Sequence, residues 1–241
     1  MIDTEKIKGI IFDYGATIDS NGKHWAEVIW DAYLDNRVPV SKEAFRNAYV
    51  YAERYLATHP VIQPDFNFKD VLSAKIDLQI NWLKENDFLA ENDKSSTYSI
   101  AVSNQCYNFV RLVLKKAIPV IQALALKYPL VLVSNFYGNI ETVLKDFKLD
   151  SYFNQIIESA VVKIRKPDPT IFLLGVKALN MKPEEVVVIG DSYKKDILPA
   201  QSLGCQTIWI KGPAWEDEKP EAMADYIITD FMELNDVLLL K

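Results

Sequence analysis

The stretch that decides the fold is GIIFDYGATIDS, residues 9–20. It opens with a short apolar run that ends at the carboxylate of Asp13, as a buried strand followed by a polar turn does. Further runs in the C-terminal half have the same form: LVLVSN from Leu130, EVVVIGD from Glu185, CQTIWIKG from Cys205 and DYIITD from Asp225. The sequence therefore predicts a set of buried strands that each end in polar or turn residues.

Helix-length segments with apolar residues near helical spacing separate these strands. They are NIETVLKDFKLD from Asn139, DPTIFLLGVKALN from Asp168 and LPAQSLG from Leu198. The last ends at Gly204, a residue type common at the C-terminal end of helices. Strands that alternate with helices predict an α/β fold with a Rossmann-like parallel sheet covered on both faces. The carboxyl ends of such strands form the binding crevice.

Between the first predicted strand and the next, the sequence predicts helices only. Its segments are HWAEVIWDAYL, KEAFRNAYVYAERYL, NFKDVLSAKIDLQINWL and YSIAVSNQCYNFVRLVL. In the third, apolar side chains recur at helical spacing from Phe68 to Leu83, as in a packed helical bundle. We therefore expect an all-helical cap to be inserted into the core.

The predicted division is a core formed by residues 1–18 and 114–241 and a helical cap formed by residues 19–113. We expect two linkers, near residues 18–23 and 110–119, on which the cap swings over the crevice. Enclosure of this kind suits small substrates and excludes water from the reacting groups.

Composition narrows the classes of function. The chain has 241 residues, of which 49% are hydrophobic. Its formal net charge of -6 argues against non-specific electrostatic binding of nucleic acid. Its cysteines, Cys106 and Cys205, lack metal-ligand spacing, so we expect small buried hydrophobes in a reducing compartment. No apolar run is long enough to span a bilayer and the N-terminus does not resemble a signal peptide, so we expect no membrane association and a cytoplasmic location.

Polar residues whose side chains could take part in catalysis or binding follow several of the apolar runs. Alone, each has an ordinary explanation as a turn residue, a helix N-cap or a solvated charge. Because the carboxyl ends of parallel strands meet at one edge, we expect these residues to converge. They are Asp13 and Thr17 in IIFDYGAT, Ser134 and Asn135 in VLVSN, Lys166 in IRKPDP, and Asp191 and Asp196 in VIGDSYKKD.

This order of motifs resembles that of the haloacid dehalogenase-like hydrolases. That family has an Asp nucleophile in DxDxT or a variant, a Ser or Thr closing the second strand, a Lys, and an acidic motif such as GDxxxxD. The segments RKPDPTIF and GDSYKKDILPAQSLGCQTIWI also resemble family members, and the helical insert is similar to the family's helical cap.

The resemblance implies a nucleophile and a metal site. Asp13 would attack phosphorus to form an aspartyl-phosphate, which divides a slow hydrolysis into two displacements. Asp13, the backbone carbonyl of Gly15 and Asp191 would hold Mg²⁺, which prefers oxygen ligands. Lys166 would neutralise charge on the nucleophile and on the transferring group.

The resemblance also implies supporting roles. Ser134 and Asn135 would bind the phosphoryl oxygens of the substrate. Asp196 would position Lys166 or a metal-bound water, and Thr17 would order the turn after the nucleophile.

Gly15 departs from the family pattern. Most phosphatases of the family have a second Asp at this position, which protonates the leaving oxygen and then deprotonates water. Glycine keeps the carbonyl that the metal needs but loses the acid, and such a loss typically costs ~10²–10⁴-fold in rate. Candidates for a substitute, by proximity in sequence alone, are Tyr14, His24 and the cap acids; His24 also suits the start of the first cap helix.

Three activities are compatible with these residues. One is a Mg²⁺-dependent phosphohydrolase acting on a small phosphorylated metabolite. Another is a metal-independent haloacid dehalogenase, since halide leaves without a proton, although Asp191 would have no obvious use there. The third is a catalytically silent phosphate-binding protein. A related variant, phosphonate cleavage, would need a cap lysine such as Lys23 or Lys42 to form a Schiff base.

Overall fold

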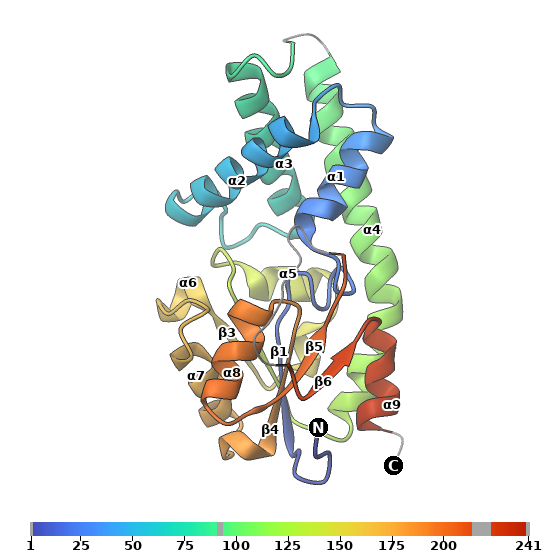
Figure 1. Ribbon diagram of the computed structural model, residues 1–241. Helices are drawn as coiled ribbons and strands as arrows, with labels where there is room; N and C mark the ends of the chain where they lie inside the picture. Colours follow the sequence, from blue (N-terminus) through green and yellow to red (C-terminus); the bar gives the residue numbers. More distant parts are fainter. Residues whose placement is uncertain (1, 91–93, 214–222, 240–241) are drawn as a thin grey trace.

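A computed structural model describes residues 2–90, 94–213 and 223–239, and it places a parallel sheet below a group of helices (Figure 1). The strands in the described residues are β1 (Gly9–Phe12), β2 (Leu130–Ser134), β3 (Gln155–Glu158), β4 (Val186–Gly190), β5 (Gln206–Ile210) and β6 (Tyr226–Ile228). They pair in parallel in the order β3-β2-β1-β4-β5-β6. The predicted α/β class with a Rossmann-like parallel sheet is confirmed.

Both faces of the sheet are covered, which explains the continuous apolar runs. Successive side chains of β1 point to opposite faces: Ile11 packs with α7 (Thr170–Ala178) and α8 (Leu198–Ser202), while Phe12 packs with α4 (Lys94–Ala125) and α9 (Leu234–Leu238). In α7, Gly175 permits a close approach to the sheet, since a Cβ there would lie 2.7 Å from Ile11 Cδ1.

Short segments complete the core and connect its strands. They are α5 (Ile140–Asp146), α6 (Ser159–Val162), the 3₁₀ turns η1 (Asp150–Tyr152), η2 (Pro183–Glu185) and η4 (Phe231–Glu233), and a π-helical turn η3 (Tyr193–Ile197) that leads directly into α8. Cys106 and Cys205 are free and buried, as the sequence predicted. No helix within the described ranges combines the length and the apolar character needed to cross a membrane.

The helices above the sheet follow the predicted segments. They are α1 (Trp25–Asp35), α2 (Lys42–Thr58), α3 (Phe68–Glu85) and the first part of α4. Polar side chains fix their starts: Ser41 accepts the N–H of Ala44 at the start of α2, and Asn67 forms a capping box with Asp70 at the start of α3.

The second predicted linker was wrong. Residues 110–119 lie inside α4, which Figure 1 shows extending from the helical part down to α9 beside the sheet. The helix continues because Val110, Leu114 and Ala117 bury an apolar face at helical spacing, and Pro119 is accommodated within it. The predicted boundary between residues 113 and 114 falls within this helix and stays a prediction.

Candidate active site

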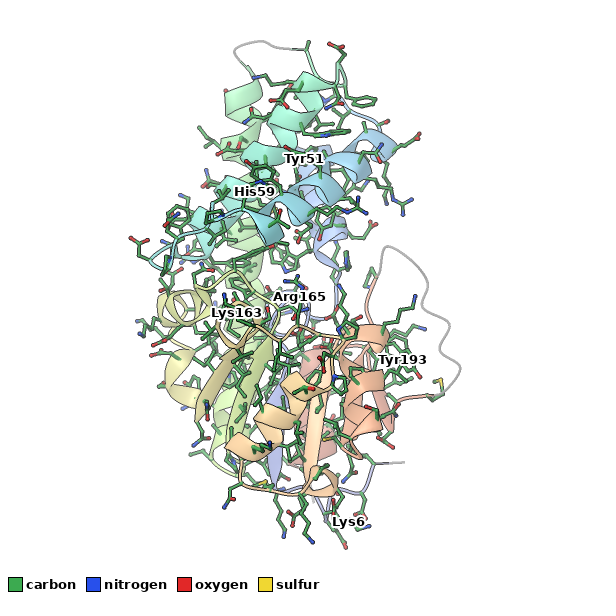
Figure 2. All side chains as sticks on the ribbon, turned by 90° about the vertical axis from the view of Figure 1, so that its left-hand side faces the viewer. Lys6, Tyr51, His59, Lys163, Arg165 and Tyr193 are labelled. Carbon is green, nitrogen blue, oxygen red and sulfur yellow. The ribbon has the colours of Figure 1, made fainter. Side chains whose placement is uncertain are left out.

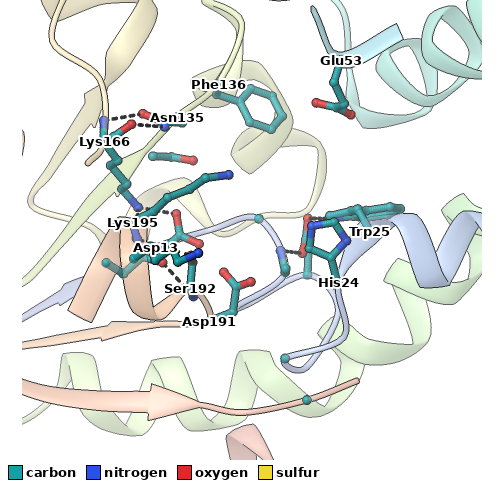
Figure 3. Close-up of a pocket in the computed structure, with 18 of the residues that line it drawn as sticks. Asp13, His24, Trp25, Glu53, Asn135, Phe136, Lys166, Asp191, Ser192 and Lys195 are labelled. Atoms are coloured by element: carbon teal, nitrogen blue, oxygen red, sulfur yellow. Dashed lines mark hydrogen bonds and ion pairs between the residues drawn. The ribbon is translucent and has the colours of Figure 1, made fainter. Parts of the chain in front are cut away.

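The centre of the sheet brings the predicted residues to one edge. Asp13 follows β1, Ser134 ends β2 and Asp191 follows β4, and β1 lies between the other two strands. Above this edge a cavity of about 620 Å³ separates the sheet from the helical part (Figure 3). All the predicted site residues except Thr17 line it: Asp13, Gly15, Ser134, Asn135, Lys166, Asp191 and Asp196.

Lys166 links two carboxylates at the base of the cavity. Its Nζ donates to Asp13 Oδ1 at 2.6 Å and to Asp196 Oδ1 at 2.7 Å. Burial alone would lower the pKa of Lys166, but the attraction of the two carboxylates outweighs it and raises the pKa above its usual value. Lys166 is therefore a fixed positive charge beside Asp13.

The Asn135 side chain holds the backbone of Lys166 in place. Its Nδ2 donates to the Lys166 carbonyl at 3.2 Å, and its Oδ1 accepts the Lys166 N–H at 3.0 Å (Figure 3). Both ends of the amide are thus engaged with the lysine. The binding of a phosphoryl group by Ser134 and Asn135 stays a prediction.

Asp196 approaches the end of β4 so closely that only glycine fits opposite it. A Cβ on Gly190 would lie 2.5 Å from the Asp196 Cβ, closer than such atoms pack. The second carboxylate oxygen of Asp196 accepts the Ser192 N–H at 3.1 Å. Gly190 and the turn after it therefore fix the carboxylate that holds Lys166.

Three carboxylates crowd the centre of the site. Asp13, Asp191 and Asp196 each offer an oxygen within 4.8 Å of the others. Burial, with repulsion from Asp196, outweighs the attraction of Lys166 and raises the pKa of Asp13 to about 6. Burial and the repulsion of Asp196 and Asp13 raise the pKa of Asp191 well above its ordinary value. The three carboxylates thus carry more negative charge than Lys166 alone neutralises.

The donor set fits a divalent cation. When all are ionised, the three carboxylates and the Lys166 ammonium group, which bonds to Asp13 and Asp196, carry two net negative charges. The Thr17 hydroxyl lies between Asp13 Oδ2, at 2.8 Å, and Asp191 Oδ1, at 3.3 Å, and its single proton serves one of them at a time. Oxygen ligands of this kind are those that Mg²⁺ prefers.

Gly15 leaves open space where a side chain would stand. It lines the cavity, and a Cβ built on it meets no atom within 4 Å. The position of the absent acid is therefore not filled by any described neighbour.

Two of the substitutes named from the sequence, His24 and Tyr14, are poorly suited to protonate a leaving group, whereas two acids of the predicted cap, Asp19 and Glu53, line the cavity. His24 is the N-cap of α1, where its Nδ1 accepts the Ala26 N–H at 3.2 Å, and burial and the Lys195 charge lower its pKa. Tyr14 is not among the described residues that line the cavity, and burial raises its pKa well above the usual value. The lowered pKa of His24 disfavours its protonated form, and Tyr14 lies outside the described lining of the cavity.

Asp19, the first acid of the predicted cap, is a buried residue of the cavity lining that the sequence analysis did not name individually. Its Oδ1 accepts the Ala16 N–H at 2.7 Å, and its Oδ2 accepts the Trp25 Nε1–H at 3.0 Å. Burial raises its pKa to about 8. Asp19 thus ties the loop after the predicted nucleophile, where Ala16 has a φ of 64°, to the start of α1.

The roof and rim of the cavity hold further polar residues that the sequence analysis did not name individually. Glu53 and Lys75 come from α2 and α3, and Tyr137 follows β2. Figure 2 shows Arg165 where the core meets the helical part, with Lys6 at the far end of the core. Other cavity residues of this group are Trp25, Lys194, Lys195 and Lys211.

The lysines considered for a Schiff base lie elsewhere. Lys23 pairs with Asp31, and Lys42 pairs with Glu27 at 3.1 Å. Neither belongs to the described lining of the cavity.

Known proteins share this sequence pattern and fold. The pattern of haloacid dehalogenase-like hydrolases matches residues 7–204. The chain is 28% identical to glyceraldehyde 3-phosphate phosphatase of Pyrococcus furiosus over 242 residues, covering 97% of this chain and 93% of that protein. It is 34% identical to phosphoserine phosphatase of Thermus thermophilus over 87 residues, covering 36% of this chain and 34% of that one.

Solved structures show the same fold at lower identity. The HAD-hydrolase YfnB from Bacillus subtilis has a TM-score of 0.61 at 20% identity, covering 97% of this chain and 99% of that chain. A dehalogenase has a TM-score of 0.63 at 17% identity, covering 99% of each chain. With the sequence match across most of the chain, these findings show that the protein belongs to the haloacid dehalogenase-like hydrolases.

Proposed function

We propose that the protein is a Mg²⁺-dependent phosphohydrolase that acts on a small phosphorylated metabolite. The observation that carries this proposal is the third carboxylate, Asp191, which lies beside Asp13 and is not among the carboxylates bonded to Lys166. A metal-free dehalogenase gives Asp191 no obvious task, whereas a divalent cation would use it as a ligand. The phosphatase relative that is similar over most of both chains supports the same choice.

Asp13 is the nucleophile of the proposed reaction. Its carboxylate attacks phosphorus, the bond from phosphorus to the leaving oxygen breaks, and an aspartyl-phosphate forms that water then hydrolyses. Lys166 neutralises the charge that accumulates at Asp13 and on the phosphoryl oxygens. Mg²⁺ held by Asp13, Asp191 and the Gly15 carbonyl would offset the repulsion between phosphate and carboxylate.

The leaving oxygen receives no proton from position 15 in this reaction. We therefore expect phosphates of good leaving groups, such as aryl esters, to react much faster than alkyl esters. This bias follows from the open space at Gly15, because no described side chain stands within 4 Å of a Cβ there.

Changing Asp191 to Asn is expected to raise the Mg²⁺ concentration needed for half-maximal turnover by at least about 10-fold, because a charged ligand is lost. The measurement is phosphate release against Mg²⁺ concentration, after treatment of the protein with a chelator. The exposed acid Asp236 on α9 provides the control, since Asp236→Asn should leave the curve unchanged. Wild-type turnover that persists in the chelator would contradict the metal dependence.

A further inference from the structure

The roof of the cavity contains a charged pair that the proposed chemistry does not use. Glu53 on α2 and Lys75 on α3 both line the cavity, and Lys75 Nζ lies 2.6 Å from Glu53 Oε1. The Lys75 side chain is 10% exposed and that of Glu53 33%. Figure 3 shows the Glu53 carboxylate reaching down from the helical part, across the cavity from Asp13.

The core supplies a third member of this group. The Tyr137 hydroxyl donates to Glu53 Oε2 at 3.1 Å, and Lys75 Nζ lies 5.6 Å from the centre of the Tyr137 ring. Tyr137 is three residues after Ser134. The pair is therefore attached to the same loop that begins at the predicted phosphoryl site, and it lies across the cavity from the predicted nucleophile Asp13.

Both members of the pair are charged. Burial alone would lower the pKa of Lys75, but the attraction of Glu53 outweighs it and raises that pKa well above the usual value. Burial alone would raise the pKa of Glu53, but Lys75 outweighs it and lowers that pKa. A protonated lysine is not a nucleophile, so this pair suits binding and not covalent chemistry.

An ion pair with one buried member, Lys75, and one partly exposed member, Glu53, selects a particular kind of partner. Removing two charges from water is costly, and the remaining donors and acceptors must be satisfied by other groups. A hydroxyl group can donate to Glu53 and accept from Lys75 at once. A carboxylate can only accept hydrogen bonds and is repelled by Glu53. An apolar chain leaves the remaining hydrogen-bonding groups of Glu53 and Lys75 without partners.

We propose that Glu53, Lys75 and Tyr137 bind hydroxyl groups of the leaving group, which makes the substrate a phosphate ester of a short, uncharged, hydroxylated carbon chain. A cavity of about 620 Å³ is of the size that encloses small molecules. This inference rests on the proposed phosphohydrolase function.

The test compares three-carbon phosphates that differ only in their polar groups. Propyl phosphate has no hydroxyl, glycerol phosphate has hydroxyls and no second charge, and phosphoglycerate adds a carboxylate. We expect kcat/KM for glycerol phosphate to exceed that for propyl phosphate by about 10–100-fold, the size of one hydrogen bond to a charged group, and also to exceed that for phosphoglycerate.

Variants of the pair should remove this preference. Glu53→Gln and the double variant Glu53→Gln/Lys75→Met are expected to bring the ratio of glycerol phosphate to propyl phosphate close to one. The double variant leaves no unpaired buried charge, so it keeps the test valid if a single variant misfolds. The control is Glu27→Gln, which breaks the pair between Glu27 on α1 and Lys42 on α2, outside the described lining of the cavity, and should keep the wild-type ratio.

Equal kcat/KM for glycerol and propyl phosphates in the wild type would overturn the inference. So would a preference for phosphoglycerate, or a wild-type ratio in a folded double variant. If none of these esters and no aryl phosphate is hydrolysed, the proposed function itself fails. Hydrolysis of all these esters without preference, in contrast, would overturn only the inference about Glu53, Lys75 and Tyr137.

Discussion

Replacing Lys166 by Met is expected to reduce phosphate turnover by at least about 10²-fold, the scale of losing one charged group that stabilises a transition state. The reason is geometric: one ammonium group lies 2.6 Å from Asp13 Oδ1 and 2.7 Å from Asp196 Oδ1. Without it, the Asp13 pKa rises further and less of the nucleophile is ionised. The measurement is kcat/KM for an aryl phosphate at saturating Mg²⁺.

Lys166→Met also leaves two buried carboxylates unpaired, which typically destabilises a protein by ~3–5 kcal/mol. The charge-retaining variant Lys166→Arg therefore accompanies it. We expect Lys166→Arg to fold but to remain slow, because a planar guanidinium does not fit the two short contacts of the ammonium. Lys177→Met on the exposed face of α7 is the control. Near-normal turnover in a folded Lys166→Met protein would contradict the assigned role.

Gly15→Asp is expected to increase turnover of alkyl phosphates. A side chain at position 15 enters open space in the cavity, with no atom within 4 Å of its Cβ. A carboxyl group there would protonate the leaving oxygen and then activate water, and such general acid and base catalysis is worth ~10²–10⁴-fold. We expect the ratio of alkyl to aryl turnover to rise, because an aryl leaving group needs the proton least.

Gly15→Asn is the matched control for this gain, since it has the same size as Asp but cannot transfer the proton. The measurement is kcat for propyl and aryl phosphates in the wild type and in both variants, with Mg²⁺ saturating. An alkyl rate that stays constant in a folded Gly15→Asp protein would show that another group already supplies the proton.

Most of the sheet could be predicted from the sequence because its central strands, β1, β2 and β4, are buried on both faces. The strands β1, β2, β4, β5 and β6 all coincide with apolar runs that end in polar residues. The strand β3 was missed because QIIE contains only two apolar residues, which lie between the polar residues Gln155 and Glu158. The other edge strand, β6, was recognised because all three of its residues, Tyr226, Ile227 and Ile228, are aromatic or apolar.

The length of α4 was underestimated for a related reason. Lys115, Lys116 and Pro119 suggest a break in the sequence, yet the two lysines lie on the exposed face. The buried face continues through Leu114 and Ala117 onto the sheet. Packing of that face against the core outweighs the proline, an effect that local sequence does not reveal.

The predicted site residues meet because parallel strands bring their carboxyl ends to one edge, which the order of motifs was enough to anticipate. The roof of the cavity was not anticipated, because it depends on how α2 and α3 face the core. One signal was present: Lys75 falls on the apolar face of α3, between Leu72 and Ile76. A charged residue on a buried face needs a partner, and Glu53 provides it.

The measurement that tests the central claim most directly is phosphate release from para-nitrophenyl phosphate by the wild type and by Asp13→Asn, each with and without Mg²⁺. The proposed function predicts turnover by the wild type only when Mg²⁺ is present, and none by Asp13→Asn. Wild-type turnover without Mg²⁺, equal turnover by the variant, or halide release from a haloacid in place of phosphate release would contradict it.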